Sequence, residues 1–163
     1  MKKPRFLFNH FEVINGICTK TNLITSLRAY YDSCEAAKAS GYNIFDSTPT
    51  TFVIARASEE REIYQFMKRF KQIGSGGSKN ERVPHKHCTE NMWVVKPAAL
   101  NQGRGIQVFR QLNEITQFIF EKNQRESFWV VQKYIEKTLL YKTRKFDIRV
   151  WSLLTNDFQI YLF

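Results

Sequence analysis

Residues 93–108 read WVVKPAALNQGRGIQV, and this stretch decides how the middle of the chain folds. An apolar run ends near Lys96, and a loop containing two glycines leads into a second short apolar run. Because glycine permits tight backbone turns, the pattern predicts strands at 92–96 and 105–109 joined by a glycine turn. We therefore expect this pair of strands to lie at the centre of the fold.

The segments on either side of this pair alternate between helix and strand. After it, apolar residues at helical spacing predict a helix through 112–119, and a β-rich run predicts a strand at 127–132. Before it, 50–54 is typical of a short strand and 59–72 of a helix with one apolar face. This order indicates an α+β fold rather than a parallel doubly wound sheet.

Two further predictions concern the outer parts of the chain. Leucines and tyrosines recur at helical spacing from about Asn22, and Thr21 is the candidate residue to cap that helix. Toward the other end, alternation over 145–155 and an apolar run over 158–163 predict two more strands.

A polar stretch rich in glycine and serine divides the chain. Residues 73–91 contain GSGGS at 74–78, followed by charged and polar side chains. Such a composition is typical of a loop or linker. We therefore expect an amino-terminal α/β region at 1–72 and a central region at 92–163.

The charge of the chain narrows the class of partner. The sequence holds 25 Lys and Arg against 15 Asp and Glu, giving +10 with neutral histidine. Such a charge favours nucleic acid, phosphate, a membrane surface or an acidic protein. The aromatic residues fall at core-like spacing, which argues against nucleic acid, and no stretch approaches the length of a membrane span. We therefore expect neither nucleic acid nor a membrane as partner.

The cysteines and histidines indicate no structural metal or disulfide framework. Cys18, Cys34 and Cys88 are too few and too scattered for a disulfide scaffold, and they suit a reducing, cytoplasmic compartment. His85, His87 and Cys88 could contact zinc, but they are crowded and lack a clear fourth ligand. A polar loop is the preferred interpretation of that segment.

Lys96 and the glycine loop after it form the first motif suited to nucleotide chemistry. Glycine lets backbone amides approach a phosphate, and lysine supplies a positive charge. The loop lacks the Gly-Lys-Ser/Thr ending of a Walker A motif, and a strand rather than a helix follows it, unlike a Rossmann fingerprint. From spacing alone, a hairpin with a surface lysine fits these residues equally well.

The second motif is VVQKYIE at 130–136, where an apolar strand runs into a polar and aromatic segment. Its backbone groups could meet the edge of an adenine, with Gln132 and Lys133 as donors. Taken alone, however, the segment fits better as a strand end that carries solvated charges.

The third motif is RKFDIRV at 144–150, where strand alternation places Lys145, Asp147 and Arg149 on one face. The carboxylate could accept from a ribose hydroxyl, and the cations could meet phosphate or carboxylate. A ladder of ion pairs on a solvated sheet face is the commoner origin of such a pattern.

Together and in this order, the motifs resemble the tubulin tyrosine ligase-like family, whose enzymes join an amino acid to tubulin using ATP on an ATP-grasp fold. The matching pieces are WVVKP at 93–97, QGRGI at 102–106, VQKYIE at 131–136 and KFDIRVW at 145–151, with NHFE at 9–12 and FD to PTTF at 45–52 before them. The resemblance implies an α+β, ATP-grasp-like fold that is incomplete at its carboxyl end.

The resemblance also implies a role for each motif residue. The residues implied to bind ATP are Lys96, Gln102, Gly103, Arg104, Gly105, Ile106, Gln132, Lys133, Tyr134, Ile135, Lys145 and Asp147. Among them, Lys96 and the 102–106 loop would meet the phosphates, and 132–135 would form the adenine-binding hinge. Arg149 would be catalytic and would lie toward the transferred phosphate.

The implied reaction is a ligation in two stages, in which ATP phosphorylates an acceptor carboxylate and the amino group of an amino acid attacks the acylphosphate. The acceptor in this family is typically a glutamate in the acidic tail of tubulin, which agrees with the +10 charge. The resemblance favours glutamate as the amino acid added, as in a polyglutamylase, with glycine and tyrosine as alternatives. It also implies a place at the cytoskeleton, with the cilium or basal body as further sites.

The resemblance also implies functional residues that are not among these 163. Members continue beyond Phe163, where we expect the Mg²⁺ ligands and an arginine that binds the amino acid. We therefore expect the chain to be an amino-terminal fragment of a ligase, without full catalysis of its own. A non-catalytic, truncated paralogue that binds tubulin or microtubules is the alternative.

Overall fold

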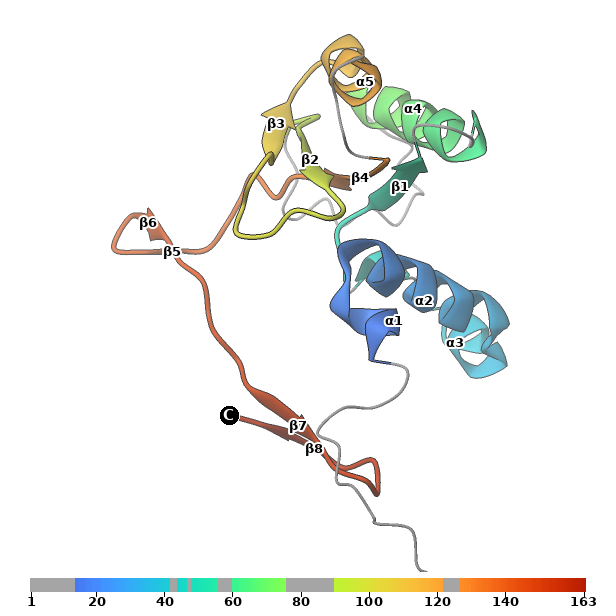
Figure 1. Ribbon diagram of the computed structural model, residues 1–163, viewed down its shortest axis with the longest axis vertical. Helices are drawn as coiled ribbons and strands as arrows, with labels where there is room; N and C mark the ends of the chain where they lie inside the picture. Colours follow the sequence, from blue (N-terminus) through green and yellow to red (C-terminus); the bar gives the residue numbers. More distant parts are fainter. Residues whose placement is uncertain (1–13, 42–43, 47, 56–59, 76–89, 122–126) are drawn as a thin grey trace, which may run out of the picture.

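The computed structural model describes residues 14–41, 44–46, 48–55, 60–75, 90–121 and 127–163. The helices are α1 (Asn15–Cys18), α2 (Lys20–Ser33), α3 (Glu35–Ala39), α4 (Glu60–Gly74) and α5 (Leu112–Phe120), with a 3-10 turn at Ile44–Asp46. The strands are β1 (Thr51–Ala55), β2 (Trp93–Pro97), β3 (Gln107–Phe109), β4 (Phe128–Lys133), β5 (Leu140–Tyr141), β6 (Arg144–Lys145), β7 (Ser152–Leu154) and β8 (Ile160–Leu162). The prediction of an α+β chain is confirmed (Figure 1).

Four of the strands form one antiparallel sheet in the order β1-β4-β2-β3. The glycine loop joins β2 to β3 directly, as the sequence predicts, and β4 lies between β1 and β2. Thr51 of β1 faces Gln132 of β4, and Gln132 also faces Val94 of β2. This register decides which side chains share a face of the sheet.

One face of this sheet carries the core, under helices α4 and α5 (Figure 1). Alternate residues of the strands point to this face, as the two-residue period of a strand requires. The Phe66 ring of α4 meets the Trp93 ring of β2 edge to face, with 5.1 Å between centroids. The fully or nearly fully buried members of the core are Phe52, Ile54, Phe66, Trp93, Val95, Ile115, Ile119, Trp129 and Val131.

Helix α2 lies over the opposite face, and Arg28 ties it to the sheet edge. Its guanidinium donates to both carboxylate oxygens of Glu62 in α4, at 3.0 and 3.1 Å, and to the Thr51 carbonyl at 2.6 Å. Because β1 is an edge strand, this contact covers a backbone oxygen that no strand pairs. Arg28 therefore joins the helices on the two faces around one edge.

The start of α2 differs from the prediction that Thr21 caps it. The helix begins at Lys20, and the side chain of Thr19 accepts from the backbone amide of Asn22 at 3.1 Å. Thr19 has extended backbone angles, which is the conformation of a capping residue, whereas Thr21 lies within the first turn. Two threonines stand near the start, and backbone conformation selects the earlier one.

The predicted strand at 145–155 is not continuous. Strand β6 ends at Lys145, residues 146–151 lie outside any strand, and β7 covers Ser152–Leu154. Within the described ranges, β5 pairs only with β6, and β7 only with β8, so two small hairpins stand apart from the four-stranded sheet (Figure 1). A strand needs a neighbour for its backbone hydrogen bonds, and among the described residues no strand pairs with 146–150. Trp151 is different, because it exchanges two backbone hydrogen bonds with Phe163, at 2.9 and 3.1 Å.

Some predictions fall outside the described residues, namely the NHFE segment at 9–12 and the polar loop with His85, His87 and Cys88. At the start of the expected linker, helix α4 continues through Gly74. Across the described ranges, each helix is too short or too polar to cross a lipid bilayer.

Candidate functional site

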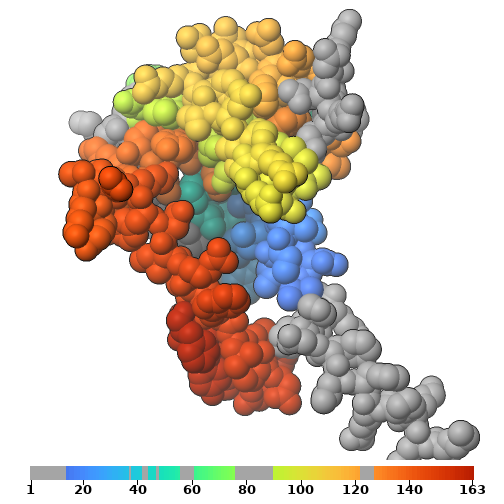
Figure 2. Space-filling view, turned by 60° about the vertical axis from the view of Figure 1, so that its left-hand side comes forward, coloured from blue at the N-terminus to red at the C-terminus, as the bar shows by residue number. Residues whose placement is uncertain are grey.

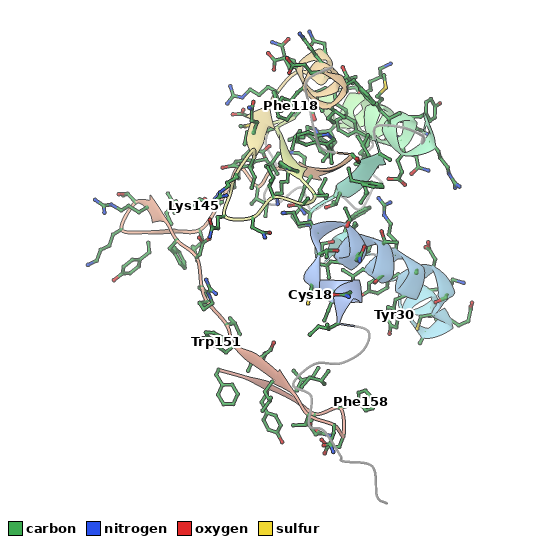
Figure 3. All side chains as sticks on the ribbon, viewed as in Figure 1. Cys18, Tyr30, Phe118, Lys145, Trp151 and Phe158 are labelled. Atoms are coloured by element: carbon green, nitrogen blue, oxygen red, sulfur yellow. The ribbon has the colours of Figure 1, made fainter. Side chains whose placement is uncertain are left out.

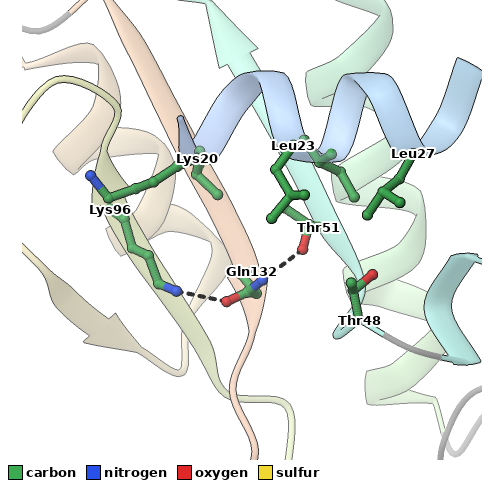
Figure 4. Close-up of a pocket in the computed structure, with 9 residues that line it drawn as sticks. Lys20, Leu23, Leu27, Thr48, Thr51, Lys96 and Gln132 are labelled. Atoms are coloured by element: carbon green, nitrogen blue, oxygen red, sulfur yellow. Dashed lines mark hydrogen bonds between the residues drawn. The ribbon is translucent and has the colours of Figure 1, made fainter. Parts of the chain in front are cut away.

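Lys96 lies on the face of the sheet that turns toward α2, at the wall of a cavity of about 150 Å³ (Figure 4). Apolar side chains from α2 and β4 and polar side chains from the strands contribute to the wall. The residues that line the cavity are Lys20, Leu23, Ile24, Leu27, Thr48, Thr51, Lys96, Val130 and Gln132. Lys96 and Gln132, from two predicted motifs, are thus brought together.

The ammonium of Lys96 is held by a side-chain amide. Lys96 Nζ donates to Gln132 Oε1 at 2.7 Å, and Gln132 Nε2 donates to Thr51 Oγ1 at 2.9 Å. Burial lowers the pKa of Lys96, and the nearby charge of Lys20 lowers it further. A lysine with a lowered pKa in a cavity is typical of a functional site, because its charge is only partly compensated by protein and water.

Lys20 joins the start of α2 to the base of the glycine loop. Its ammonium donates to the carbonyl of Leu100 at 2.5 Å and of Ala98 at 3.4 Å. These carbonyls lie 80 and 78 residues along the chain from Lys20. Sequence reasoning missed both Lys20 and the role of Thr51, because nothing near them in the sequence distinguishes them from other lysines and threonines.

The glycine loop is exposed and depends on positive backbone angles. Gly103 has φ +75° and Gly105 has φ +69°, and the non-glycine Gln102 has φ +57°. A Cβ on Gly105 would come within 2.8 Å of the Pro97 side chain, so this position needs glycine for space as well as conformation. Arg104 donates to Gln102 Oε1 at 3.0 Å. With Ile106, all five residues of the predicted loop over the phosphates lie on the surface.

The predicted adenine hinge divides between the two faces of β4. Gln132 points to the cavity, whereas Lys133 is buried on the core side, where it pairs with Glu136. The Lys133 ammonium also donates to the carbonyls of Met92 at 3.0 Å and Tyr134 at 3.1 Å. The hypothesis that the Lys133 side chain offers a donor to adenine does not match this arrangement, because strand alternation sends it to the other face.

The backbone of the hinge is also engaged within the protein. The amide of Lys133 donates to the Thr50 carbonyl at 2.7 Å, and that of Tyr134 donates to the Met92 carbonyl at 3.0 Å. The next residue, Ile135, lies at the surface. The backbone amides of Lys133 and Tyr134 are therefore not free to donate to a base.

The third motif lies largely apart from Lys96. Lys145, labelled in Figure 3, follows the hinge in the chain. Its ammonium lies 5.1 Å from the centre of the Tyr134 ring and 3.5 Å from the Tyr134 hydroxyl. Asp147 and Arg149 are exposed on the segment that follows β6. In the described part of the chain, no hydrogen bond or ion pair joins either of them to Lys96. The face shared by Lys145, Asp147 and Arg149 in the prediction is therefore not formed as a strand.

The described residues do not offer a metal site. Among them, no three His, Cys, Asp or Glu side chains gather closely enough to hold an ion. The arrangement can instead contact an anion through Lys96, in a cavity whose apolar wall reduces competition from water.

The sequence matches the model of one protein family over residues 1–163, and its description is "Tubulin-tyrosine ligase family". Several relatives are similar over a shorter stretch. Tubulin glycylase 3C of Tetrahymena thermophila is 42% identical over 97 residues, which covers 58% of this chain and 8% of that protein. Tubulin glycylase 3A of Drosophila melanogaster is 46% identical over 67 residues, which covers 41% and 7%.

A human relative has a similar name and matches this chain over a stretch of similar length. Protein monoglycylase TTLL8 of Homo sapiens is 44% identical over 68 residues, which covers 40% of this chain and 8% of that protein. The matches thus span less than a tenth of these relatives.

Proposed function

The chain belongs to the tubulin-tyrosine ligase family, and we propose that it is part of an ATP-dependent ligase that adds glycine to tubulin. The names of its relatives support glycine, because three of them are called glycylases or monoglycylases. They favour the glycine-adding alternative over glutamate addition, which the sequence resemblance had put first. Tubulin as substrate rests on two of these names, which both read tubulin glycylase, and on the description of the family.

The observation that carries the nucleotide part of this proposal is the Lys96 ammonium at the cavity wall. It comes from the WVVKP motif, and its partner Gln132 comes from the hinge motif, so two predicted ATP-binding motifs meet at one place. The four-stranded antiparallel sheet supports an ATP-grasp-like arrangement in which the β2–β3 loop covers the phosphates. Gln102, Gly103, Arg104, Gly105 and Ile106 make up that loop.

Lys96 would donate to phosphate oxygens and offset their charge. In the proposed reaction, a carboxylate oxygen of the acceptor attacks the terminal phosphorus of ATP, and ADP leaves. The glycine amino group then attacks the acyl carbon, an amide forms, and phosphate leaves. A cation beside the transferred group stabilises its charge in such a step. Mg²⁺ has no proposed ligand among the described residues.

The acceptor proposed is an acidic tail of tubulin. The +10 charge of the chain steers acidic partners toward it and raises their association rate. A protein with this partner works at the cytoskeleton, and cilia and basal bodies, which are built from microtubules, are the places proposed for it.

Titration calorimetry with a non-hydrolysable ATP analogue tests the nucleotide site in this chain. Replacing Lys96 with methionine removes the charge and should weaken binding by about tenfold or more, as expected for a charge-assisted hydrogen bond. Lys38→Met is the matched control, because Lys38 lies on the exposed helix α3 and pairs with Glu35. Equal affinity of the Lys96→Met and Lys38→Met proteins would remove Lys96 from the site.

A second experiment tests the reaction. The chain is incubated with tubulin, ATP and labelled glycine, and with labelled glutamate in parallel. ATP-dependent incorporation of glycine supports the proposal, and incorporation of glutamate alone contradicts the choice of amino acid. Co-sedimentation with microtubules without incorporation favours the non-catalytic binding module.

A further inference from the structure

Three polar side chains from three strands form a continuous hydrogen-bonded row beneath α2 (Figure 4). Thr51 and Gln132 face each other across β1 and β4, and Lys96 of β2 lies diagonally across from Gln132. The row ends at the backbone, since Thr51 Oγ1 donates to the Pro49 carbonyl at 2.7 Å. The register of the sheet thus links Lys96 to β1, the far edge strand.

The direction of each hydrogen bond in the row is determined by its two ends. An ammonium can only donate, so the atom that faces Lys96 must be the oxygen of the Gln132 amide. The Thr51 hydroxyl has a single proton, which it gives to Pro49, so toward Gln132 it can only accept. Both ends therefore require the same orientation of the amide, with its nitrogen toward Thr51.

We propose that Thr51 is a positioning residue for Lys96: its hydroxyl orients the Gln132 amide, which in turn holds the Lys96 ammonium at the cavity. Without that hydroxyl, the amide nitrogen would lose its acceptor. Only the contact with Lys96 would then hold the amide, which would be fixed at one end instead of two. Lys96 would therefore face an acceptor that is held less firmly.

The backbone of Thr51 is itself held from outside the sheet. Its carbonyl accepts from Arg28, and Arg28 is paired with Glu62 of α4. Thr51 is almost fully buried, with 2% of its surface exposed. Contacts from α2 and α4 therefore hold the backbone of Thr51 in place. Because the backbone is held, the hydroxyl has a fixed position from which it can orient the Gln132 amide.

This inference rests on the proposed function in one respect only, which is that Lys96 binds the phosphates of ATP. The row of hydrogen bonds requires no nucleotide, so its test is made without one. Thr51→Val removes the hydroxyl and keeps the shape of the side chain, and Thr51→Ser keeps the hydroxyl and removes the methyl group. Thr25→Val is the matched control, since Thr25 is exposed on α2 and its hydroxyl bonds only within that helix.

Two readouts report on the row in the purified chain. Hydrogen exchange of the Gln132 side-chain amide, followed by NMR, should become about tenfold faster in Thr51→Val because the Thr51 acceptor is lost. Acylation of Lys96 by an amine-reactive ester, followed by mass spectrometry, should accelerate severalfold because the acceptor of its ammonium is held less firmly. Thr51→Ser and Thr25→Val should match the unmodified chain in both.

Unchanged exchange and acylation in Thr51→Val would overturn the proposal. So would a Thr51→Ser protein that behaves like Thr51→Val, because the methyl group and not the hydroxyl would then matter. If Thr51→Val does not fold, Thr51→Ala provides the same two measurements.

A double-mutant cycle separates a relay from two independent contributions. Gln132→Met should accelerate acylation of Lys96, and adding Thr51→Val should change nothing more, because the intermediate group is already gone. Additive effects would overturn the relay.

Nucleotide affinity is measured separately on the same proteins. If Lys96 labelling responds to Thr51→Val while Lys96→Met binds the ATP analogue normally, the positioning role stands and the proposed nucleotide site fails. If Lys96→Met loses nucleotide while Thr51→Val leaves labelling unchanged, the positioning role alone fails.

Discussion

The four-stranded sheet and the segment from Tyr134 to Phe163 carry parts of the same predicted nucleotide site, yet they are built differently. In the sheet, Lys96 and Gln132 stand on strands with neighbours on both sides, and each side chain has a defined partner. In the later segment, each of the two hairpins pairs only within itself, as far as the described part of the chain shows. The comparison teaches that an alternating sequence specifies side-chain geometry only where neighbouring strands hold it.

Burial follows the same division. Trp93 in the sheet is fully buried, whereas Trp151, labelled in Figure 3 just before β7, keeps 69% of its surface exposed. Figure 2 shows the carboxyl-terminal residues, coloured red, on the surface at the lower end of the described part of the chain. The exposed apolar side chains of the second hairpin and the residue after it include Leu153, Phe158, Ile160, Tyr161, Leu162 and Phe163. The free energy of unfolding of this chain should therefore depend on the sheet and its helices far more than on the later hairpins.

Two tryptophan substitutions test this division with the largest expected effect. Trp93→Ala removes a ring that packs against Phe52, Phe66 and Phe70, and should lower the free energy of unfolding by about 3–5 kcal/mol. Trp151→Ala should change it by less than about 0.5 kcal/mol. Urea denaturation followed by circular dichroism measures both. Similar losses in the two variants would show that the later segment also packs into the stable body.

Charged pairs offer a second contrast, of somewhat smaller size. Glu136→Ala leaves the buried Lys133 ammonium without its carboxylate and should cost about 3 kcal/mol, since an unpaired buried charge is unfavourable. Glu35→Ala breaks the exposed pair with Lys38 and should cost less than about 1 kcal/mol. The midpoints of urea unfolding compare the two. A small loss in Glu136→Ala would mean that Lys133 reaches water when its partner is removed.

Local patterns predicted the sheet well and the cavity poorly. The glycine loop, the two strands beside it and helix α5 follow from neighbouring residues, so the central elements could be predicted. The cavity depends on contacts between distant residues. Thr51 and Gln132 are 81 positions apart, and no local pattern pairs them.

Two differences between prediction and structure have definite physical causes. Alternation along β4 separates Gln132 from Lys133, so the sequence already contained the reason why their side chains point to opposite faces of the sheet. The break after Lys145 could not be foreseen, because it depends on whether a neighbouring strand is present. The local sequence shows the two-residue alternation of a strand, but it does not show which strand will pair with it.

The glycine loop lies at the end of strands β2 and β3, and Lys20 holds its base through two hydrogen bonds. Lys20→Met should free the carbonyls of Ala98 and Leu100 and raise the rate of tryptic cleavage after exposed Arg104 severalfold, because cleavage requires local opening. The free energy of unfolding should fall by only about 1 kcal/mol. The initial rate of the fragment ending at Arg104, measured by mass spectrometry, should stay unchanged in Lys38→Met. An unchanged rate in Lys20→Met would show that the loop is held by other contacts.

The smallest effect on the free energy of unfolding is expected at Asp147, a residue predicted to bind ATP. Asp147→Asn removes a charge from a side chain that lies at the surface beyond β6, so the free energy of unfolding should change by less than about 0.5 kcal/mol. If Asp147 completes the nucleotide site, affinity for the ATP analogue should nevertheless fall about threefold, the loss of one exposed polar contact. Asp32→Asn on α2 is the control, because Asp32 is equally exposed. Identical affinities in the two variants would remove Asp147 from the nucleotide site.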